Sequence, residues 1–263
     1  MLKEIIHFAH ANGFPAKTYS KLFSYLEEDF EINYLEQHAH NPKFPVADGW
    51  ERLRDELREE LEKRYAQKII GVGHSLGGVL HLLVAAENPE LYKAIILLDA
   101  PIISRLSSAG IKFLKKTNLM EKIPLARTTR FRRSFWNTKE EAFEHFRQKE
   151  KFVDFDAEVL RDYIENGTIK TENGVKLLFE PKTEAMIYQT LPDNLPKLRK
   201  KLKVPTVYIG GTKSREARLA RLGFMRNNFD FKFHFLEGSH LFPLEKPKET
   251  AEIIKEVLKP LIK

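Results

Sequence analysis

One stretch decides the fold: Lys68-Ile69-Ile70-Gly71-Val72-Gly73-His74-Ser75-Leu76-Gly77-Gly78-Val79-Leu80. A short apolar run stops at a serine flanked by glycines and resumes as an apolar segment, which predicts a strand, a sharp turn and a helix. The turn fits the pattern G-x-S-x-G, in which both glycines make room for a tightly bent backbone and a strained serine. We therefore expect the Ser75 hydroxyl to stand at the top of a sheet, beside the positive end of a helix dipole.

Length and composition favour one large α/β domain, or one domain that carries an insertion, because the chain has 263 residues. It contains no cysteine, so disulfides are excluded. Met1-Leu2-Lys3-Glu4 leads directly into a strand-like run without the pattern of a secretory signal, and we expect a cytoplasmic protein. No apolar run approaches the roughly 20 residues that span a bilayer, so we expect no stable membrane insertion.

Strand-like apolar runs alternate with helical segments toward both ends of the chain. This alternation predicts a mostly parallel, doubly wound sheet with helices on both faces. The predicted strands are 5–9, 31–35, 68–73, 94–98, 205–209 and 231–236, and the predicted helices are 15–28, 50–65, 76–88 and 246–259.

The segment 103–202 interrupts this alternation. It contains helical stretches at 104–116, 139–149 and 157–165, a short helical piece after Lys182, and a hairpin at 167–179 with an Asn173-Gly174 turn. We therefore predict a core formed by 1–102 and 203–263, and a mainly helical cap, or lid, formed by 103–202.

A serine hydroxyl is a poor nucleophile near neutral pH unless a base takes its proton. His240 follows the last predicted strand in a loop of small residues, Glu237-Gly238-Ser239-His240. That loop leaves the sheet at the same edge as Ser75, where open parallel sheets hold their sites. His240 is therefore the candidate base.

The chain resembles the α/β-hydrolase fold superfamily, in its capped serine hydrolase form. Three elements carry the resemblance: Asn12-Gly13-Phe14-Pro15, similar to a His-Gly-Phe-Pro oxyanion turn; Gly73-His74-Ser75-Leu76-Gly77-Gly78; and Gly238-Ser239-His240-Leu241-Phe242, followed by Glu245-Lys246-Pro247. The resemblance implies that Ser75 is the nucleophile and His240 the general base and acid. It also implies that the backbone N–H groups of Leu76 and Phe14 form the oxyanion hole.

The acid of the triad departs from the usual pattern. The family's aspartate follows the strand before the last, but Gly211-Thr212-Lys213-Ser214 has a serine at that place. Some members of the fold carry the acid one strand earlier, which makes Asp99 the candidate, with Glu216 in reserve. The alternative for Asp99 is an aspartate that forms a turn and caps the segment after it.

The resemblance implies a cofactor-independent serine hydrolase. We expect a carboxylesterase that cleaves small to medium esters through an acyl-enzyme on Ser75. One alternative is a catalytically degenerate binding protein, which the serine at position 214 supports. A second alternative is an acyl-CoA thioesterase.

The remaining histidines have simpler interpretations. His74 lies beside the nucleophile, where it packs or orients the turn. The pair His38 and His40 has no accompanying cysteine or carboxylate motif, so we expect no metal site. The others are expected to be satisfied core side chains: His7, His10, His81 and His234.

The segment 103–137 carries nine cations and one acidic residue, Glu121, which leaves a charge of 9 − 1 = +8 against +7 for the whole chain. It would attract an anionic or phosphate-bearing substrate, or rest on acidic lipid through apolar side chains. The alternative is a solubilising surface. No nucleic-acid recognition motif is present. The cations are Arg105, Lys112, Lys115, Lys116, Lys122, Arg127, Arg130, Arg132 and Arg133, and the apolar side chains are Phe113, Leu114, Phe131, Phe135 and Trp136.

Overall fold

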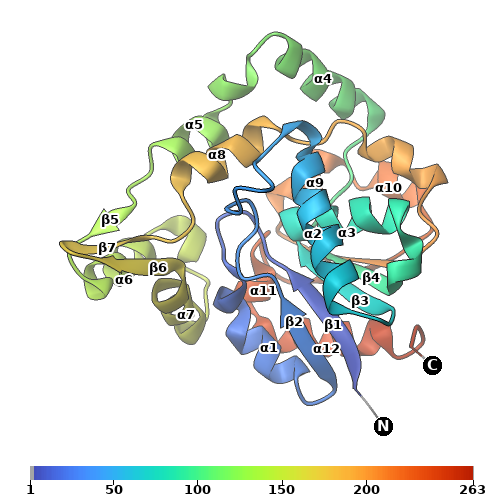
Figure 1. Ribbon diagram of the computed structural model, residues 1–263, viewed down its shortest axis with the longest axis horizontal. Helices are drawn as coiled ribbons and strands as arrows, with labels where there is room; N and C mark the ends of the chain where they lie inside the picture. Colours follow the sequence, from blue (N-terminus) through green and yellow to red (C-terminus); the bar gives the residue numbers. More distant parts are fainter. Residues whose placement is uncertain (1–2, 263) are drawn as a thin grey trace.

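The computed structural model describes residues 3–262 and is built around a sheet of six parallel strands (Figure 1). Their order across the sheet is β2-β1-β3-β4-β8-β9. Every neighbouring pair is parallel, which confirms the predicted fold class. The strands are β1 (Glu4–Ala9), β2 (Phe30–Tyr34), β3 (Ile69–His74), β4 (Tyr92–Leu98), β8 (Thr206–Gly211) and β9 (Phe231–Leu236).

Helices cover both faces of this sheet because its central strands are apolar on both sides. In β4, Ile96 and Leu98 belong to the cluster that α1 and α12 cover, whereas Ile95 and Leu97 belong to the cluster that α2, α3 and α10 cover. A strand buried on both faces needs a continuous apolar run rather than an alternating one. The helices are α1 (Ser20–Leu26), α2 (Glu51–Arg64), α3 (Leu76–Glu87), α10 (Gly223–Asn228) and α12 (Pro247–Leu258).

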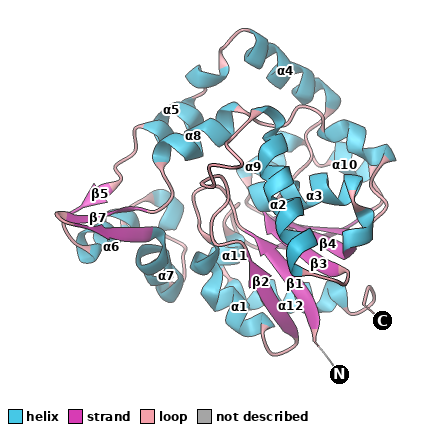
Figure 2. Cartoon of the chain, viewed as in Figure 1, coloured by secondary structure: helices cyan, strands magenta, loops and turns pink. Residues whose placement is uncertain are grey.

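The chain between β4 and β8 lies outside the large sheet and is mostly helical, with one small antiparallel sheet in the order β5-β7-β6 (Figure 2). Its division from the core as a separate cap stays a prediction. The elements are α4 (Arg105–Lys116), α5 (Pro124–Arg130), β5 (Phe135–Trp136), α6 (Lys139–Arg147), α7 (Ala157–Gly167), β6 (Thr168–Thr171), β7 (Gly174–Leu177) and α8 (Pro181–Gln189).

The turn of the hairpin in this segment differs from the predicted turn. Thr171 pairs with Gly174, so Glu172 and Asn173 form the turn and Gly174 begins β7. A Cβ on Gly174 would lie 2.2 Å from the carbonyl oxygen of Trp136, because the unpredicted strand β5 packs directly against it. Gly174 thus allows β5 to pair with β7 as the third strand of the small sheet. Also unpredicted were α5, α10 and α9 (Arg215–Ala220), which are too short to show a clear period.

Candidate active site

The turn at Ser75 joins β3 to α3 and holds this residue at φ 52° and ψ −112°, a strained conformation for a residue with a Cβ. Two glycines make the turn possible. A Cβ on Gly77 would lie 2.0 Å from the Ala9 carbonyl oxygen, and one on Gly73 would lie 2.4 Å from the backbone of Gly77. Ser75 is partly exposed, although the residues on both sides of it are buried. The turn therefore leaves Ser75 more accessible than its neighbours in the chain.

Ser75, His240 and Asp99 form a hydrogen-bonded row. His240 Nε2 lies 3.0 Å from Ser75 Oγ, and His240 Nδ1 lies 2.6 Å from Asp99 Oδ2. Each residue follows a different strand, and these strands, β3, β4 and β9, end at one edge of the sheet. The row has the geometry of a nucleophile, a base and an orienting acid.

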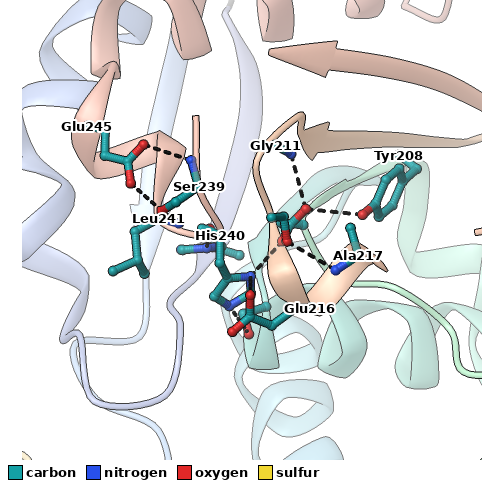
Figure 3. A network of polar contacts seen from close by, with 12 residues as sticks. Tyr208, Gly211, Glu216, Ala217, Ser239, His240, Leu241 and Glu245 are labelled. Carbon is teal, nitrogen blue, oxygen red and sulfur yellow. Dashed lines mark hydrogen bonds and ion pairs between the residues drawn. The ribbon is translucent and has the colours of Figure 1, made fainter. Parts of the chain in front are cut away.

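The Asp99 carboxylate is fully buried, and other donors also hold it in place (Figure 3). Oδ1 accepts hydrogen bonds from the Tyr208 hydroxyl and the Gly211 N–H, both at 3.1 Å. Oδ2 accepts one from the Ser214 hydroxyl at 2.5 Å. The serine at the usual position of the acid is therefore a donor to a carboxylate that comes from the neighbouring strand.

Asp99 and Glu216 differ sharply in their relation to His240. Glu216 Oε2 lies 3.9 Å from His240 Nδ1, and its side chain is 48% exposed (Figure 3). Asp99 is completely buried, and its oxygens are used by the donors named above, not by an N-terminal cap of the segment after it. Geometry thus favours Asp99 as the partner of the imidazole.

The pKa of His240 is set by opposing effects. Burial of the ring lowers it, but the hydrogen bond and the negative charge of Asp99 outweigh burial, and Glu216 adds to them. The net result is a pKa above the ordinary value for histidine. The imidazole is therefore a stronger base than one free in water.

Glu245 holds the loop that carries His240 (Figure 3). Its carboxylate accepts hydrogen bonds from the Ser239 N–H, at 2.9 Å, and from the Ser239 hydroxyl. The Ser239 Oγ in turn accepts the Leu241 N–H at 3.0 Å. These bonds bracket His240 on both sides and limit the freedom of its backbone.

His74 connects three parts of the site. Its Nε2–H donates to the His240 carbonyl oxygen at 2.8 Å, so its Nδ1 accepts from the Tyr19 hydroxyl at 2.7 Å. The Tyr19 oxygen accepts the Ala11 N–H at 3.3 Å, in the loop after β1. Burial, together with the nearby His240, lowers the pKa of His74 to about 3. His74 is thus neutral and orients the turn, as its position suggested.

The two predicted oxyanion donors differ in availability. Leu76 is the first residue of α3, so its N–H has no acceptor within the helix. The Phe14 N–H donates to the Ala11 carbonyl oxygen at 3.1 Å and closes a turn in which Gly13 has φ +83°. Phe14 could serve an oxyanion only by sharing this bond, and its role stays a prediction.

Residues 8–253 match the family described as the alpha/beta hydrolase family. The chain belongs to this family. Among curated proteins no match was found. The membership agrees with the order of the three sequence elements and with the parallel sheet.

Solved structures similar to this α/β hydrolase share its fold at low sequence identity. E-2-(Acetamidomethylene)succinate hydrolase has a TM-score of 0.78 at 18% identity, with 97% of this chain and 91% of that chain covered. A peroxisomal alpha-beta-hydrolase from Saccharomyces cerevisiae has a TM-score of 0.76 at 16% identity, over 99% and 78%. The thioesterase domain from the curacin biosynthetic pathway has 0.74 at 16%, over 96% and 91%.

This α/β hydrolase also contains a charged cluster that was not predicted from the sequence. Arg132 Nη2 lies 2.6 Å from Glu184 Oε2, and the Glu184 side chain is buried against Gly13 in the predicted oxyanion turn. The Asn12 side chain donates to the Glu184 carbonyl oxygen at 3.1 Å. Lys151 Nζ lies 5.2 Å from the centre of the Phe14 ring. No local pattern identifies these residues, which converge only in the folded chain.

Of the histidines that were predicted to be satisfied core side chains, His7, His10 and His81 are buried, whereas His234 is partly exposed, which corrects the prediction. Neither ring nitrogen of His7 has a hydrogen-bond partner within the described part of the chain, so this ring is buried but not satisfied. Burial lowers the pKa of His7 and His10, and it lowers that of His81 to about 3, so these rings are neutral. Among residues 3–262, Asp99, Glu216 and His240 are the one group of side chains with metal-ligand spacing. Two of these three are already joined by the short hydrogen bond of the row. Within the same residues, no helix combines the length and hydropathy that crossing a bilayer requires.

Proposed function

We propose that this α/β hydrolase is a serine carboxylesterase that cleaves small to medium esters through an acyl-enzyme on Ser75. The observation that carries the proposal is the unbroken row from the Ser75 hydroxyl through the His240 imidazole to the Asp99 carboxylate. The partly exposed, strained serine adds to it. The row supplies a base within reach of the nucleophile and an acid that orients the base.

The proposed reaction has two stages. His240 Nε2 takes the proton of Ser75 as its oxygen attacks the ester carbonyl, and the Leu76 N–H stabilises the resulting oxyanion. The imidazolium then gives its proton to the leaving alcohol, which leaves Ser75 acylated. In the second stage His240 removes a proton from water, which attacks the acyl group. The imidazolium then returns the proton to Ser75 Oγ as the bond to the acyl carbon breaks and the carboxylic acid leaves. Asp99 holds the imidazole with Nδ1 protonated throughout.

The competing proposal is a degenerate protein that only binds ligands. Its support was the serine at position 214, where the family has its acid. Ser214 instead donates to Asp99 and, through the same oxygen, caps α9 by accepting the Ala217 N–H at 3.0 Å. This arrangement favours the enzyme, since a serine at this place is compatible with an acid on β4.

Labelling with a fluorophosphonate tests the proposal. The Ser75 oxygen would attack phosphorus and fluoride would leave, with the hydroxyl proton passing to His240. We expect the native protein to react rapidly, with the added mass located on Ser75, and the heat-unfolded protein to remain unlabelled. A native, folded chain that does not react would favour the degenerate binding protein.

We also infer that the segment 103–202 acts as a lid and favours an acyl group that carries a negative charge. Lys151, in this segment, is exposed, and its Nζ lies 5.2 Å from the centre of the ring of Phe14, in the predicted oxyanion turn. The positive charge of Lys151 also acts on His240, whose pKa it lowers. A carboxylate on the substrate would provide the counter-charge. The positive charge of Lys151 would also suit acyl-CoA esters, which are the substrates in the thioesterase alternative.

Lys151→Met should lower the preference for anionic esters. We expect the ratio of kcat/KM for p-nitrophenyl hemisuccinate to that for p-nitrophenyl butyrate to fall about tenfold or more, since a hydrogen bond to a charged group contributes ~1.5–3 kcal/mol. The exposed Lys149 provides the matched control, and Lys149→Met should leave the ratio unchanged. If both variants keep the wild-type ratio and still hydrolyse p-nitrophenyl butyrate, the proposed preference for anionic esters is wrong. The proposed esterase activity would not be affected by that result.

A further inference from the structure

Helix α4 is unusually exposed for an amphipathic helix. Ser108 is its only buried residue. Leu106 and Phe113, seven residues apart and hence on one face, are 81% and 62% exposed. Figure 1 shows α4 at the edge of the molecule, away from the large sheet. This face of α4 therefore has no covering within residues 3–262.

The opposite face of α4 is attached to the rest of the protein. Lys115 Nζ lies 2.6 Å from Asp48 Oδ1 and 3.3 Å from Asp193 Oδ2. The exposed cations Arg105, Lys112 and Lys116 share a third face of the helix, beside the apolar one. The helix thus has an anchored side, an apolar side and a cationic side.

Helix α5 and the residue after it also carry exposed apolar side chains. Leu125 is 51% exposed and Phe131 is 76% exposed, whereas Ala126 and Thr129 are buried. Figure 1 places α5 next to α8, and both near the same edge as α4. We call the exposed apolar and cationic side chains of α4, of α5 and of the adjoining residues Lys122 and Phe131 the docking face: Arg105, Leu106, Lys112, Phe113, Lys116, Lys122, Leu125, Arg127, Arg130 and Phe131.

The charge of the segment 103–137 is concentrated on the docking face. Of its nine cations, three are paired with carboxylates: Lys115, Arg132 with Glu184, and Arg133 with Glu141. The other six are exposed, and among residues 3–262 none of the six has a carboxylate oxygen within 4.0 Å. Trp136, which the sequence placed among the apolar contacts, is fully buried and does not belong to the face.

We propose that the docking face binds the surface of a membrane that contains anionic lipid. Exposed cations are attracted to anionic headgroups, and exposed leucine and phenylalanine side chains enter the region between headgroups and acyl chains. A nucleic acid would use the cations but leave the apolar side chains without a role. A second copy of the chain would place its own six exposed cations against these six, and the like charges would repel each other.

Sedimentation of the full-length protein with vesicles tests the proposal. We expect binding to vesicles of phosphatidylcholine mixed with phosphatidylglycerol, little binding to phosphatidylcholine alone, and weaker binding at high salt. Lys112→Gln with Lys116→Gln should weaken binding about 30-fold, since each cation near an anionic surface contributes a factor of about five. Leu106→Ser with Phe113→Ser should weaken it by about tenfold or more.

The control is Val153→Ser, since Val153 is 66% exposed and lies outside the docking face. It should bind as the wild type does, and circular dichroism should show each variant to be folded. The proposal is wrong if the wild type binds neither vesicle, or if both double variants bind as tightly as the wild type. It is also wrong if the wild type forms dimers that the Leu106 and Phe113 variant abolishes. None of these results depends on hydrolase activity.

Discussion

Ser75→Ala should reduce the turnover of p-nitrophenyl esters by about 10⁶-fold, the effect of removing a catalytic serine in the well-studied serine proteases. The reason is chemical: no other hydroxyl is placed 3.0 Å from His240 Nε2 by the hydrogen bonds described. The measurement is kcat/KM at neutral pH, with the melting temperature as the check on folding. Because Ser75 is partly exposed, loss of its hydroxyl should change the stability little.

The matched control is Ser24→Ala, which removes an exposed hydroxyl from α1 and should leave the turnover unchanged. Undiminished turnover in a folded Ser75→Ala protein would refute Ser75 as the nucleophile. Loss of folding would be seen as a lowered melting temperature. Residual fluorophosphonate labelling at another serine would then identify the group that reacts.

Asp99→Asn should reduce turnover by about 10⁴-fold, the cost of the equivalent change in a serine protease. Oδ1 accepts two hydrogen bonds, from Tyr208 and Gly211, so the amide oxygen of asparagine will occupy that place. The amide NH₂ then faces His240 Nδ1, which must become an acceptor. The proton moves to Nε2, and the imidazole can no longer take the proton of Ser75.

Glu216→Gln is the control for the acid and should change turnover by no more than about fivefold, because an exposed ion pair contributes ~0–1 kcal/mol. A larger loss in Glu216→Gln than in Asp99→Asn would transfer the role of the acid to Glu216. Both side chains lie near His240 Nδ1, so this comparison separates them directly.

The pH profile gives a second measure of the same contact. Protonated His240 cannot act as a base, so kcat/KM falls as the pH falls through the pKa of His240. Asp99 holds that pKa above the ordinary value, even though burial acts in the opposite direction. In Asp99→Asn the negative charge is lost, and the acid limb of the residual activity should move to lower pH. An unmoved limb would show that Asp99 does not act through His240.

The motif around Ser75 could be recognised from the sequence because its geometry has a strict local requirement. Only glycine fits at positions 73 and 77, where a Cβ would meet backbone atoms at 2.4 and 2.0 Å. Strands such as β3 and β4 could also be predicted, because a strand that is buried on both faces needs a continuous run of apolar residues. The parallel sheet and the family were predicted from these features, and both are confirmed.

From the sequence, Asp99 was the candidate for the acid, with Glu216 in reserve, and a turn-forming role for Asp99 stayed open. Asp99 and His240 are 141 positions apart, and they meet because β4, β8 and β9 are neighbours in the sheet. Ser214 occupies the place where the family has its acid, which suggested from the sequence that the acid was missing there. A hydroxyl there is what a buried carboxylate on the adjacent strand requires as a donor.

By itself, the sequence determined the parallel α/β fold, the strained turn at Ser75 and the loop of His240, because each depends on residues that are close in the chain. Only the tertiary structure decided which carboxylate contacts His240, and that Lys151 Nζ lies 5.2 Å from the centre of the Phe14 ring. It also decided which of the nine cations stay exposed. Those outcomes depend on side chains that converge from distant segments, and no local periodicity records such contacts.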